Sequence, residues 1–101
     1  MFYEQIIDEC LKNGIEPLIT ICHFELPIAL LEKYGGWRDR RTIAAFVRFA
    51  GTMFRHFKGK VKYWLTFNEI NMLMHLPFGG AGVYFQQGED PEKVKYQVAH
   101  H

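Results

Sequence analysis

The sequence has too few cysteines for a disulfide scaffold and too little net charge for a surface that binds polyanions. Its two cysteines, Cys10 and Cys22, both lie among apolar residues, as free thiols of a reduced protein do. Twelve Lys and Arg against eleven Asp and Glu give a formal net charge of +1, which offers no general attraction to nucleic acid or an acidic membrane. A cytoplasmic compartment is therefore expected, with no nucleic-acid partner.

Long apolar runs and metal-ligand spacings are also missing. No segment reaches the roughly 18 uncharged apolar residues of a membrane span, and the N-terminus, Met1-Phe2-Tyr3-Glu4, has neither the basic start nor the apolar stretch of a signal peptide. His56, His75, His100 and His101 lack the spacings of a metal site with each other or with the cysteines. We expect no membrane segment, no metal and no cofactor, and assign no function to the terminal His pair.

What is present is the composition of a protein with a core, in a short chain. Hydrophobic residues make up 49% and charged residues 23%, close to the averages of globular domains. The 101 residues fit one domain but fall far short of the roughly 250 of a closed eight-stranded α/β barrel.

The apolar pattern alternates between the periods of helices and strands. Two short runs rich in β-branched and aromatic residues, at about 17–23 and 61–67, predict strands. Helical spacing and end signals predict helices over 2–13, 27–33, 42–59 and from 91 to the end, with loops between them. A helix between two strands is typical of a βαβ unit with a parallel pair.

Two strands with three or four helices cannot close a barrel, and their outer edges keep unpaired N–H and C=O groups. We therefore expect residues 1–101 to be one fragment of a larger α/β protein. Its strand edges, together with apolar helix faces around Phe46, Phe54 and Phe57, should favour self-association.

Both predicted strands end in polar residues. His23 and Glu25 follow the first strand, and Asn68 and Glu69 follow the second. Parallel strands bring these ends to the same face, where an imidazole, a carboxamide and a carboxylate suit a neutral polyol such as a sugar. Plainer interpretations exist: a loop glutamate is usually only solvated, His23 could be a hydrogen-bonded structural histidine, and Glu25 could face the helix start at Pro27.

Two other features could bind phosphate, but each has a simpler interpretation. The basic run 38–41 contains Asp39 and opens the strongest helix, which favours a solvated helix start over a nucleic-acid site. The glycines at 79, 80 and 82 are not followed by Gly-Lys-Ser/Thr and so do not form a P-loop.

Longer motifs are specific enough to name a family. Gly14-Ile15-Glu16-Pro17-Leu18, Cys22-His23-Phe24-Glu25-Leu26-Pro27, Lys33-Tyr34-Gly35-Gly36-Trp37 and Val61-Lys62-Tyr63-Trp64-Leu65-Thr66-Phe67-Asn68-Glu69 resemble glycoside hydrolase family 1 in order and spacing. The resemblance implies part of a (β/α)8 TIM barrel, covering its third and fourth strands. It also implies that Glu69 is the general acid/base, that Asn68 bonds the sugar 2-hydroxyl, and that His23 binds the glycone.

Within the family, the chain is similar to the bacterial 6-phospho-β-glucosidase branch. Phe24 stands where many members have Trp, Ile70 stands where many have Pro, and the loop 77–82 also fits this branch. The implied substrate of the complete protein is a small phosphorylated β-glucoside.

A retaining glycosidase needs a second carboxyl group as nucleophile. The family's Glu-Asn-Gly motif is absent from these residues, and Glu25 does not occupy its place. We expect the chain alone to be inactive. The alternative is a non-catalytic module for sugar binding or assembly.

Overall fold

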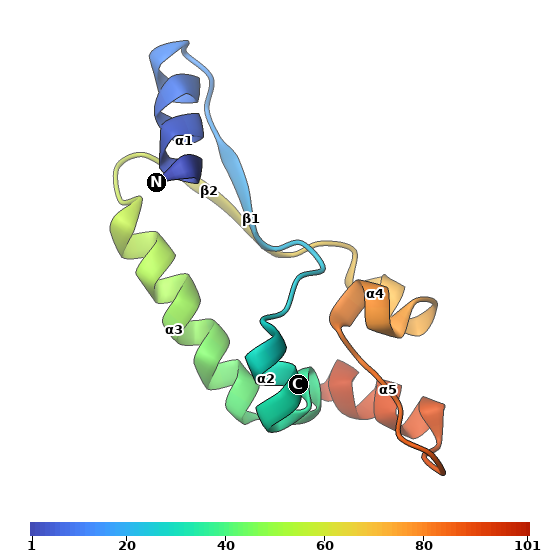
Figure 1. The fold of residues 1–101 in the computed structure, drawn as a ribbon. Helices are drawn as coiled ribbons and strands as arrows, with labels where there is room; N and C mark the ends of the chain where they lie inside the picture. The colour runs from blue at the N-terminus through green and yellow to red at the C-terminus, as the bar shows by residue number, and fades with distance from the viewer.

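The computed structural model describes all 101 residues as two strands, five α-helices and two short 3₁₀ helices (Figure 1). In chain order these are α1 (Phe2–Lys12), β1 (Leu18–Cys22), α2 (Ile28–Tyr34), η1 (Gly36–Arg38), α3 (Arg41–His56), β2 (Tyr63–Phe67), η2 (Ile70–Met74), α4 (Pro77–Ala81) and α5 (Pro91–His100).

The two strands pair in parallel, as the sequence predicts. In the register, Leu18 lies opposite Tyr63 at the start of the pair and Cys22 lies opposite Phe67 at its end. Helix α3 connects the strands, so that β1, α3 and β2 form the predicted βαβ unit. The expected α/β arrangement, with two parallel strands and flanking helices, is therefore confirmed.

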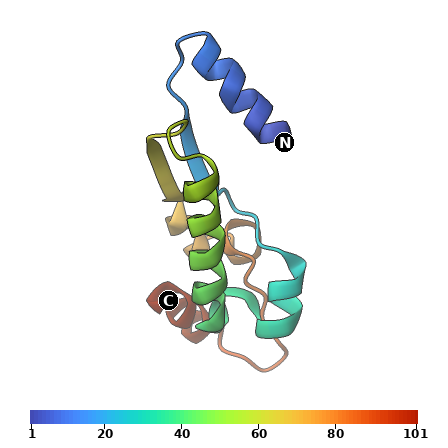
Figure 2. The same cartoon turned by 90° about the vertical axis from the view of Figure 1, so that its left-hand side faces the viewer.

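The molecule is long and open. Its extents are 53 × 24 × 21 Å and its radius of gyration is 15.9 Å, compared with about 13 Å for a compact domain of this length. Figure 2 shows α1 leaning away at one end, α5 at the other, and α3 running between them. Only eleven of the 101 residues are buried, so most apolar side chains of this chain are partly or fully exposed to solvent.

Most of the buried residues form two separate clusters, one at each end of the strand pair. The amino-end cluster consists of Ile7, Phe57 and Val61, with Ile19, Met53 and Trp64 packed against it. The carboxyl-end cluster consists of Leu73, Val83, Val94 and Val98, with Trp37, Ala81 and Phe85 packed against it.

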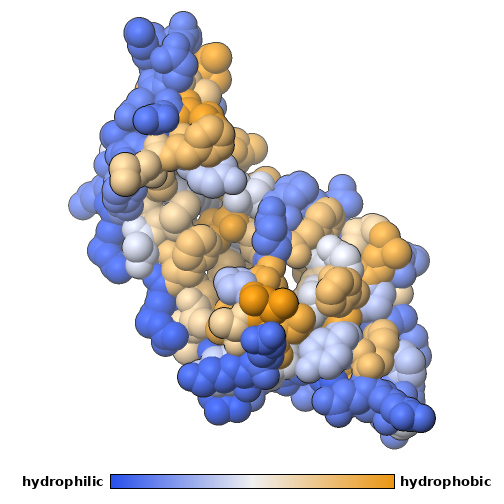
Figure 3. All heavy atoms as spheres, viewed as in Figure 1, coloured by the Kyte–Doolittle hydropathy of each residue, from blue (hydrophilic) through white to orange (hydrophobic).

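The apolar faces expected around three phenylalanines are only partly open. Phe54 is 45% exposed, but Phe57 is only 5% exposed because α1 packs Ile7 against it. Phe46 is half-buried under the rings of Trp37 and Phe67. Leu18, Tyr63 and Leu65 on the strands remain largely exposed, and Figure 3 shows apolar residues gathered over the middle of one face.

The stretch after Glu69, predicted as a loop, instead contains η2 and α4, which raises the number of α-helices to five. Pro77 occupies the first turn of α4, and Gly82 ends it at φ 64°. A side chain at Gly80 would come within 2.9 Å of the Met72 Cβ atom, so this glycine lets α4 lie directly on η2. Elements of five residues are too short for a periodic apolar pattern to reveal.

Candidate active site

The carboxyl ends of the two strands meet at one edge of the sheet. Cys22 is paired with Phe67, and the Asn68 N–H donates to the Cys22 carbonyl oxygen at 3.0 Å. The polar segments 23–25 and 68–69 therefore leave the sheet side by side, as expected for a parallel pair.

The segment after β1 is a tight turn closed by Glu25. The His23 N–H donates to the Glu25 Oε2 atom at 3.0 Å, and the Cys22 thiol donates to the Glu25 carbonyl oxygen at 3.1 Å. Between them Phe24 adopts φ 72°, in the left-handed region. The His23 ring meets the Phe24 ring edge-on, with 5.0 Å between centroids, and both His23 and Glu25 are exposed.

The segment after β2 repeats the same backbone feature. Glu69, the second residue after its strand as Phe24 is after β1, has φ 41°. Its carbonyl oxygen accepts from the Met72 N–H at 2.9 Å, which begins η2. Non-glycine residues adopt this conformation rarely, and such strain concentrates at functional sites. Glu69 is exposed and Asn68 half-buried.

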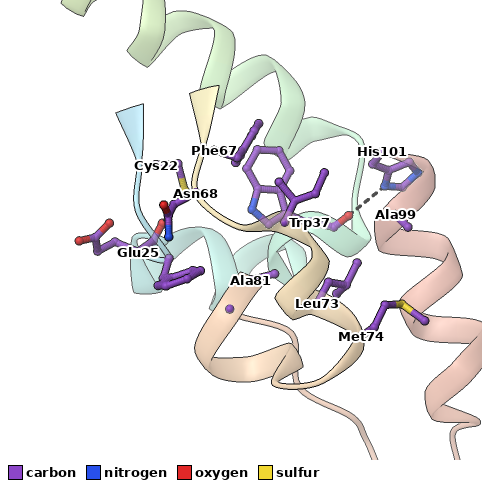
Figure 4. Close-up of a pocket in the computed structure, with 13 residues that line it drawn as sticks. Cys22, Glu25, Trp37, Phe67, Asn68, Leu73, Met74, Ala81, Ala99 and His101 are labelled. Carbon is purple, nitrogen blue, oxygen red and sulfur yellow. Dashed lines mark hydrogen bonds between the residues drawn. The ribbon is translucent and has the colours of Figure 1, made fainter. Parts of the chain in front are cut away.

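A pocket of about 370 Å³ opens beside these turns. Its lining is mostly apolar and includes Trp37, Phe67, Leu73 and Ala81, with Asn68 from the strand end (Figure 4). Cys22 also lines it, and burial, together with the charge of the nearby Glu25 carboxylate, raises the pKa of this thiol.

Three aromatic rings behind the pocket connect it to β2. The Trp37 ring packs edge-on against Phe46 and Phe67, at centroid distances of 5.7 and 5.3 Å, and Phe46 stacks on Phe67 at 4.8 Å. Phe67 is the last residue of β2, so this packing fixes the backbone from which Asn68 and Glu69 leave.

The short helix η1 is tied to distant parts of the chain by polar contacts. The buried Thr42 hydroxyl donates to the Gly36 carbonyl oxygen, and the His101 Nδ1 atom lies 2.9 Å from the Trp37 carbonyl oxygen (Figure 4). The Gln97 side chain donates to the Arg38 carbonyl oxygen at 3.0 Å. The terminal His pair, to which the sequence assigns nothing, thus contributes one structural contact through His101.

The Arg38 guanidinium forms a two-pronged ion pair with the Glu89 carboxylate. Hydrogen bonding to Arg38, together with the Gln86 N–H, lowers the pKa of Glu89. Two of the three arginines in the basic run 38–41 are therefore engaged within the chain: besides the Arg38 pair, Arg41 binds Asp39, whose pKa it lowers to about 2.

The three predicted site residues are brought to the same edge but not into one cavity. Asn68 lines the pocket, whereas His23 and Glu69 do not and are exposed. The sequence-based interpretation missed Trp37 and Phe67 as pocket residues. The Gly35-Gly36 pair before Trp37 was the available signal, because a helix stop followed by a large aromatic residue marks a ring held in a tight turn.

Two further observations concern bound groups and membranes. The structure holds no group of three or more His, Cys, Asp or Glu side chains placed to bind a metal ion. None of its helices has the length and apolar character needed to cross a membrane.

Comparison with known proteins gives consistent matches over the full chain. The family model described as Glycosyl hydrolase family 1 matches residues 1–101. The chain is 55% identical over 100 residues to the 6-phospho-beta-glucosidase AscB of Escherichia coli, and 49% identical over 100 residues to the aryl-phospho-beta-D-glucosidase BglH of Bacillus subtilis. Each alignment covers 99% of this chain and 21% of the relative, so the chain spans about a fifth of their length.

A solved structure, the rice Os3BGlu6 beta-glucosidase, superposes on the chain with a TM-score of 0.73. The two are 34% identical, and the match covers 97% of this chain and 23% of the rice chain. The arrangement of strands and helices is therefore that of one part of a β-glucosidase barrel.

Proposed function

The chain belongs to glycosyl hydrolase family 1, because the family model matches all of it, and on this premise we propose that it is a segment of a 6-phospho-β-glucosidase. The complete protein would hydrolyse the β-glycosidic bond of 6-phosphorylated glucosides with retention of configuration. Residues 1–101 would supply the third and fourth strands of its barrel domain.

The observation that carries this proposal is the meeting of the two polar segments at the carboxyl edge of a parallel strand pair. Active sites of α/β barrels lie at this edge, on the loops that follow the strands. The names of the bacterial relatives, which include phospho-β-glucosidases from Escherichia coli and Bacillus subtilis, support the phosphorylated substrate.

In the proposed mechanism, the Glu69 carboxyl protonates the oxygen of the leaving group and later, as a carboxylate, removes a proton from the attacking water. The Asn68 amide would hold the sugar 2-hydroxyl and the His23 imidazole would hold the glycone. The exposure of His23 and Glu69 fits side chains that meet a substrate from the sheet edge.

The second carboxyl group of the reaction must come from another part of the barrel. Retaining enzymes hold their two carboxyl groups about 5 to 5.5 Å apart, and these residues contain no Glu-Asn-Gly motif. Glu25 is not a substitute, because its carboxylate accepts from the His23 N–H within its own turn. The chain alone is thus proposed to be inactive.

We also propose that the protein is cytoplasmic. The support is that Cys10 and Cys22 are both free thiols, as is usual in a reducing compartment. For the isolated chain we propose self-association. Its support is the exposure of Leu18 and Leu65 on strands with open outer edges.

The proposal is tested with a hybrid protein in which this chain replaces the matching segment of the Escherichia coli relative. We expect the hybrid to hydrolyse a 6-phosphorylated aryl β-glucoside with a higher kcat/KM than the unphosphorylated compound. Equal or reversed preference would contradict the phosphorylated substrate. Binding of either glycoside without turnover would instead support the non-catalytic module.

Glu69→Gln in the same hybrid tests the acid/base role. Loss of general acid catalysis should lower kcat/KM about 10²- to 10⁴-fold for a glucoside with a poor leaving group. For an activated aryl leaving group the loss should be much smaller, because such a group departs without protonation. Glu32→Gln, at an exposed glutamate of α2, is the matched control. Equal losses for both leaving groups would reject Glu69 as the acid.

A further inference from the structure

The turn that carries His23 is held in a strained conformation by one side chain. Phe24 has φ 72°, which costs a non-glycine residue about 1 to 3 kcal/mol and persists only when its surroundings enforce it. The Glu25 Oε2 atom accepts from the His23 N–H at 3.0 Å. A carboxylate acceptor makes such a bond stronger than a neutral one.

The Glu25 side chain has no other assigned task. Helix α2, which begins three residues further on, has no side-chain cap at its N-terminus, so Glu25 does not cap it. Glu25 lies at the edge of the pocket, and Figure 4 shows its carboxylate pointing away from Trp37. Its side chain turns back toward the strand end instead of forward to the helix.

A second contact on the same residue closes the turn from the other side. The Cys22 thiol donates to the Glu25 carbonyl oxygen at 3.1 Å. Glu25 therefore binds the last residue of β1 through its backbone and the next residue through its side chain. The His23 ring, packed edge-on against Phe24 at 5.0 Å, projects from the segment that these two bonds define.

We propose that Glu25 is a positioning residue: its carboxylate fixes the turn Cys22–Glu25 and thereby aims the His23 imidazole at the glycone. This inference rests on the proposed function for the role of His23, but not for the hydrogen bond. Glu25 itself touches no substrate and takes no part in proton transfer.

The test compares single and double variants in the hybrid protein. Glu25→Ala removes the acceptor and should lower kcat/KM about three- to tenfold, the effect of one lost hydrogen bond, mainly by raising KM. Glu25→Gln keeps an acceptor oxygen and should restore most of the loss. Glu32→Ala, at an exposed glutamate of α2, should change nothing.

The decisive comparison is made in the His23→Ala background. If Glu25 acts through His23, then Glu25→Ala should have no further effect on kcat/KM once the imidazole is gone. An equal loss in both backgrounds would overturn the proposal, because a merely structural residue would act regardless of His23.

A measurement without substrate separates this inference from the proposed function. In the hybrid labelled with ¹⁵N-histidine, the His23 amide resonance, identified by its loss in His23→Ala, should lie downfield in the wild type because its N–H donates to the Glu25 carboxylate, and it should move upfield in Glu25→Ala, which has no acceptor. Glu25→Gln, which keeps an acceptor oxygen, should restore most of the downfield position. The same resonance position in Glu25→Ala and in the wild type would overturn the positioning role, even if the hybrid were an active glycosidase. An inactive hybrid whose His23 amide moves upfield in Glu25→Ala would refute the proposed function and still confirm the bond that fixes the turn.

Discussion

The two clusters at opposite ends of the strand pair are built by different means. The amino-end cluster joins α1 to the end of α3 through Ile7, Phe57 and Val61, with ion pairs from the half-buried Lys60 to α1. The carboxyl-end cluster joins η2, α5 and the loop before it, and its elements are tied to η1 by specific polar contacts. The amino end is held mainly by apolar packing between α1 and the end of α3. At the carboxyl end, apolar packing is supplemented by hydrogen bonds and an ion pair to η1.

This difference assigns different tasks to the two ends. In α/β barrels, the amino face of the strands contributes stability and the carboxyl face contributes chemistry. Side chains that must meet a substrate need fixed backbone positions at the strand ends, and the contacts of η1 supply them. Variants at the amino and carboxyl ends of the strand pair, made in the hybrid protein, should separate effects on stability from effects on activity.

The largest effect is expected from Trp37→Ala at the carboxyl end. Truncating a large packed aromatic residue destabilises a protein by about 3 kcal/mol or more, and the lost ring contacts both Phe46 and Phe67. Because Phe67 precedes Asn68 and Glu69, kcat/KM should fall as well. Urea unfolding and steady-state kinetics measure the two effects, and unchanged kcat/KM would contradict the link between Trp37 and the strand end.

Ile7→Ala should destabilise the amino end by about 2 to 3 kcal/mol, since Ile7 is only 3% exposed in the structure. Ile7 lies at the opposite end of the strands from the proposed site residues, so kcat/KM measured well below the unfolding temperature should stay the same. A loss of activity equal to that of Trp37→Ala would break the division between the two ends.

Adjacent glycines of α4 provide a smaller and sharper test. Gly80→Ala places a Cβ atom 2.9 Å from Met72 Cβ and 3.2 Å from Met72 C, which should cost about 1 to 3 kcal/mol by overpacking. Gly79 has no neighbour within 4 Å of its Cβ position, so Gly79→Ala should be neutral or stabilise α4 by up to about 1 kcal/mol. Urea unfolding of the two variants compares them directly, and equal effects would reject the close contact of α4 with η2.

The smallest effect concerns pH. Arg38 lowers the pKa of Glu89 below its ordinary 4.5, and Lys60 does the same for Glu4. A carboxyl group whose pKa is lowered on folding stabilises the protein at pH values above its ordinary pKa. This stabilisation is lost as the pH falls through the folded-state pKa. Glu89→Gln should therefore lower the unfolding temperature at neutral pH, and the difference from wild type should shrink below pH 4.5.

Glu4→Gln is the matched variant at the amino end. Its change should be smaller, because Lys60 is 37% exposed and Arg38 only 20%, and solvent weakens exposed pairs. Thermal unfolding across this pH range measures both variants. A larger effect at Glu4 would contradict the view that the carboxyl end depends more on its polar contacts.

Helix α3 and the two strands could be predicted from sequence because their apolar patterns are local. The apolar positions of α3, such as Ile43, Phe46 and Ala50, recur at helical spacing, and the predicted and observed helices agree apart from a few residues at the ends. The strands and their parallel pairing also follow from short apolar runs on either side of that helix.

The carboxyl end depends on contacts between residues far apart in the chain, which no local pattern contains. The Arg38 and Glu89 pair spans 51 residues and the His101 contact with Trp37 spans 64. The site was partly predictable: the strand pattern placed His23, Asn68 and Glu69 at one edge, but it could not foresee that Phe24 and Glu69 would adopt left-handed backbones. The proposed roles of His23, Asn68 and Glu69 remain predictions.

The elongated shape has a calorimetric consequence. The heat-capacity change of unfolding grows with the apolar surface that leaves water on folding, and with eleven buried residues this chain removes little of it. Its free energy of unfolding should therefore vary with temperature with little curvature. Further strands and helices that covered Leu18, Leu65 and Phe54 would increase this curvature. The increase in the heat-capacity change of unfolding on their association would then measure how much apolar surface each added β/α unit covers.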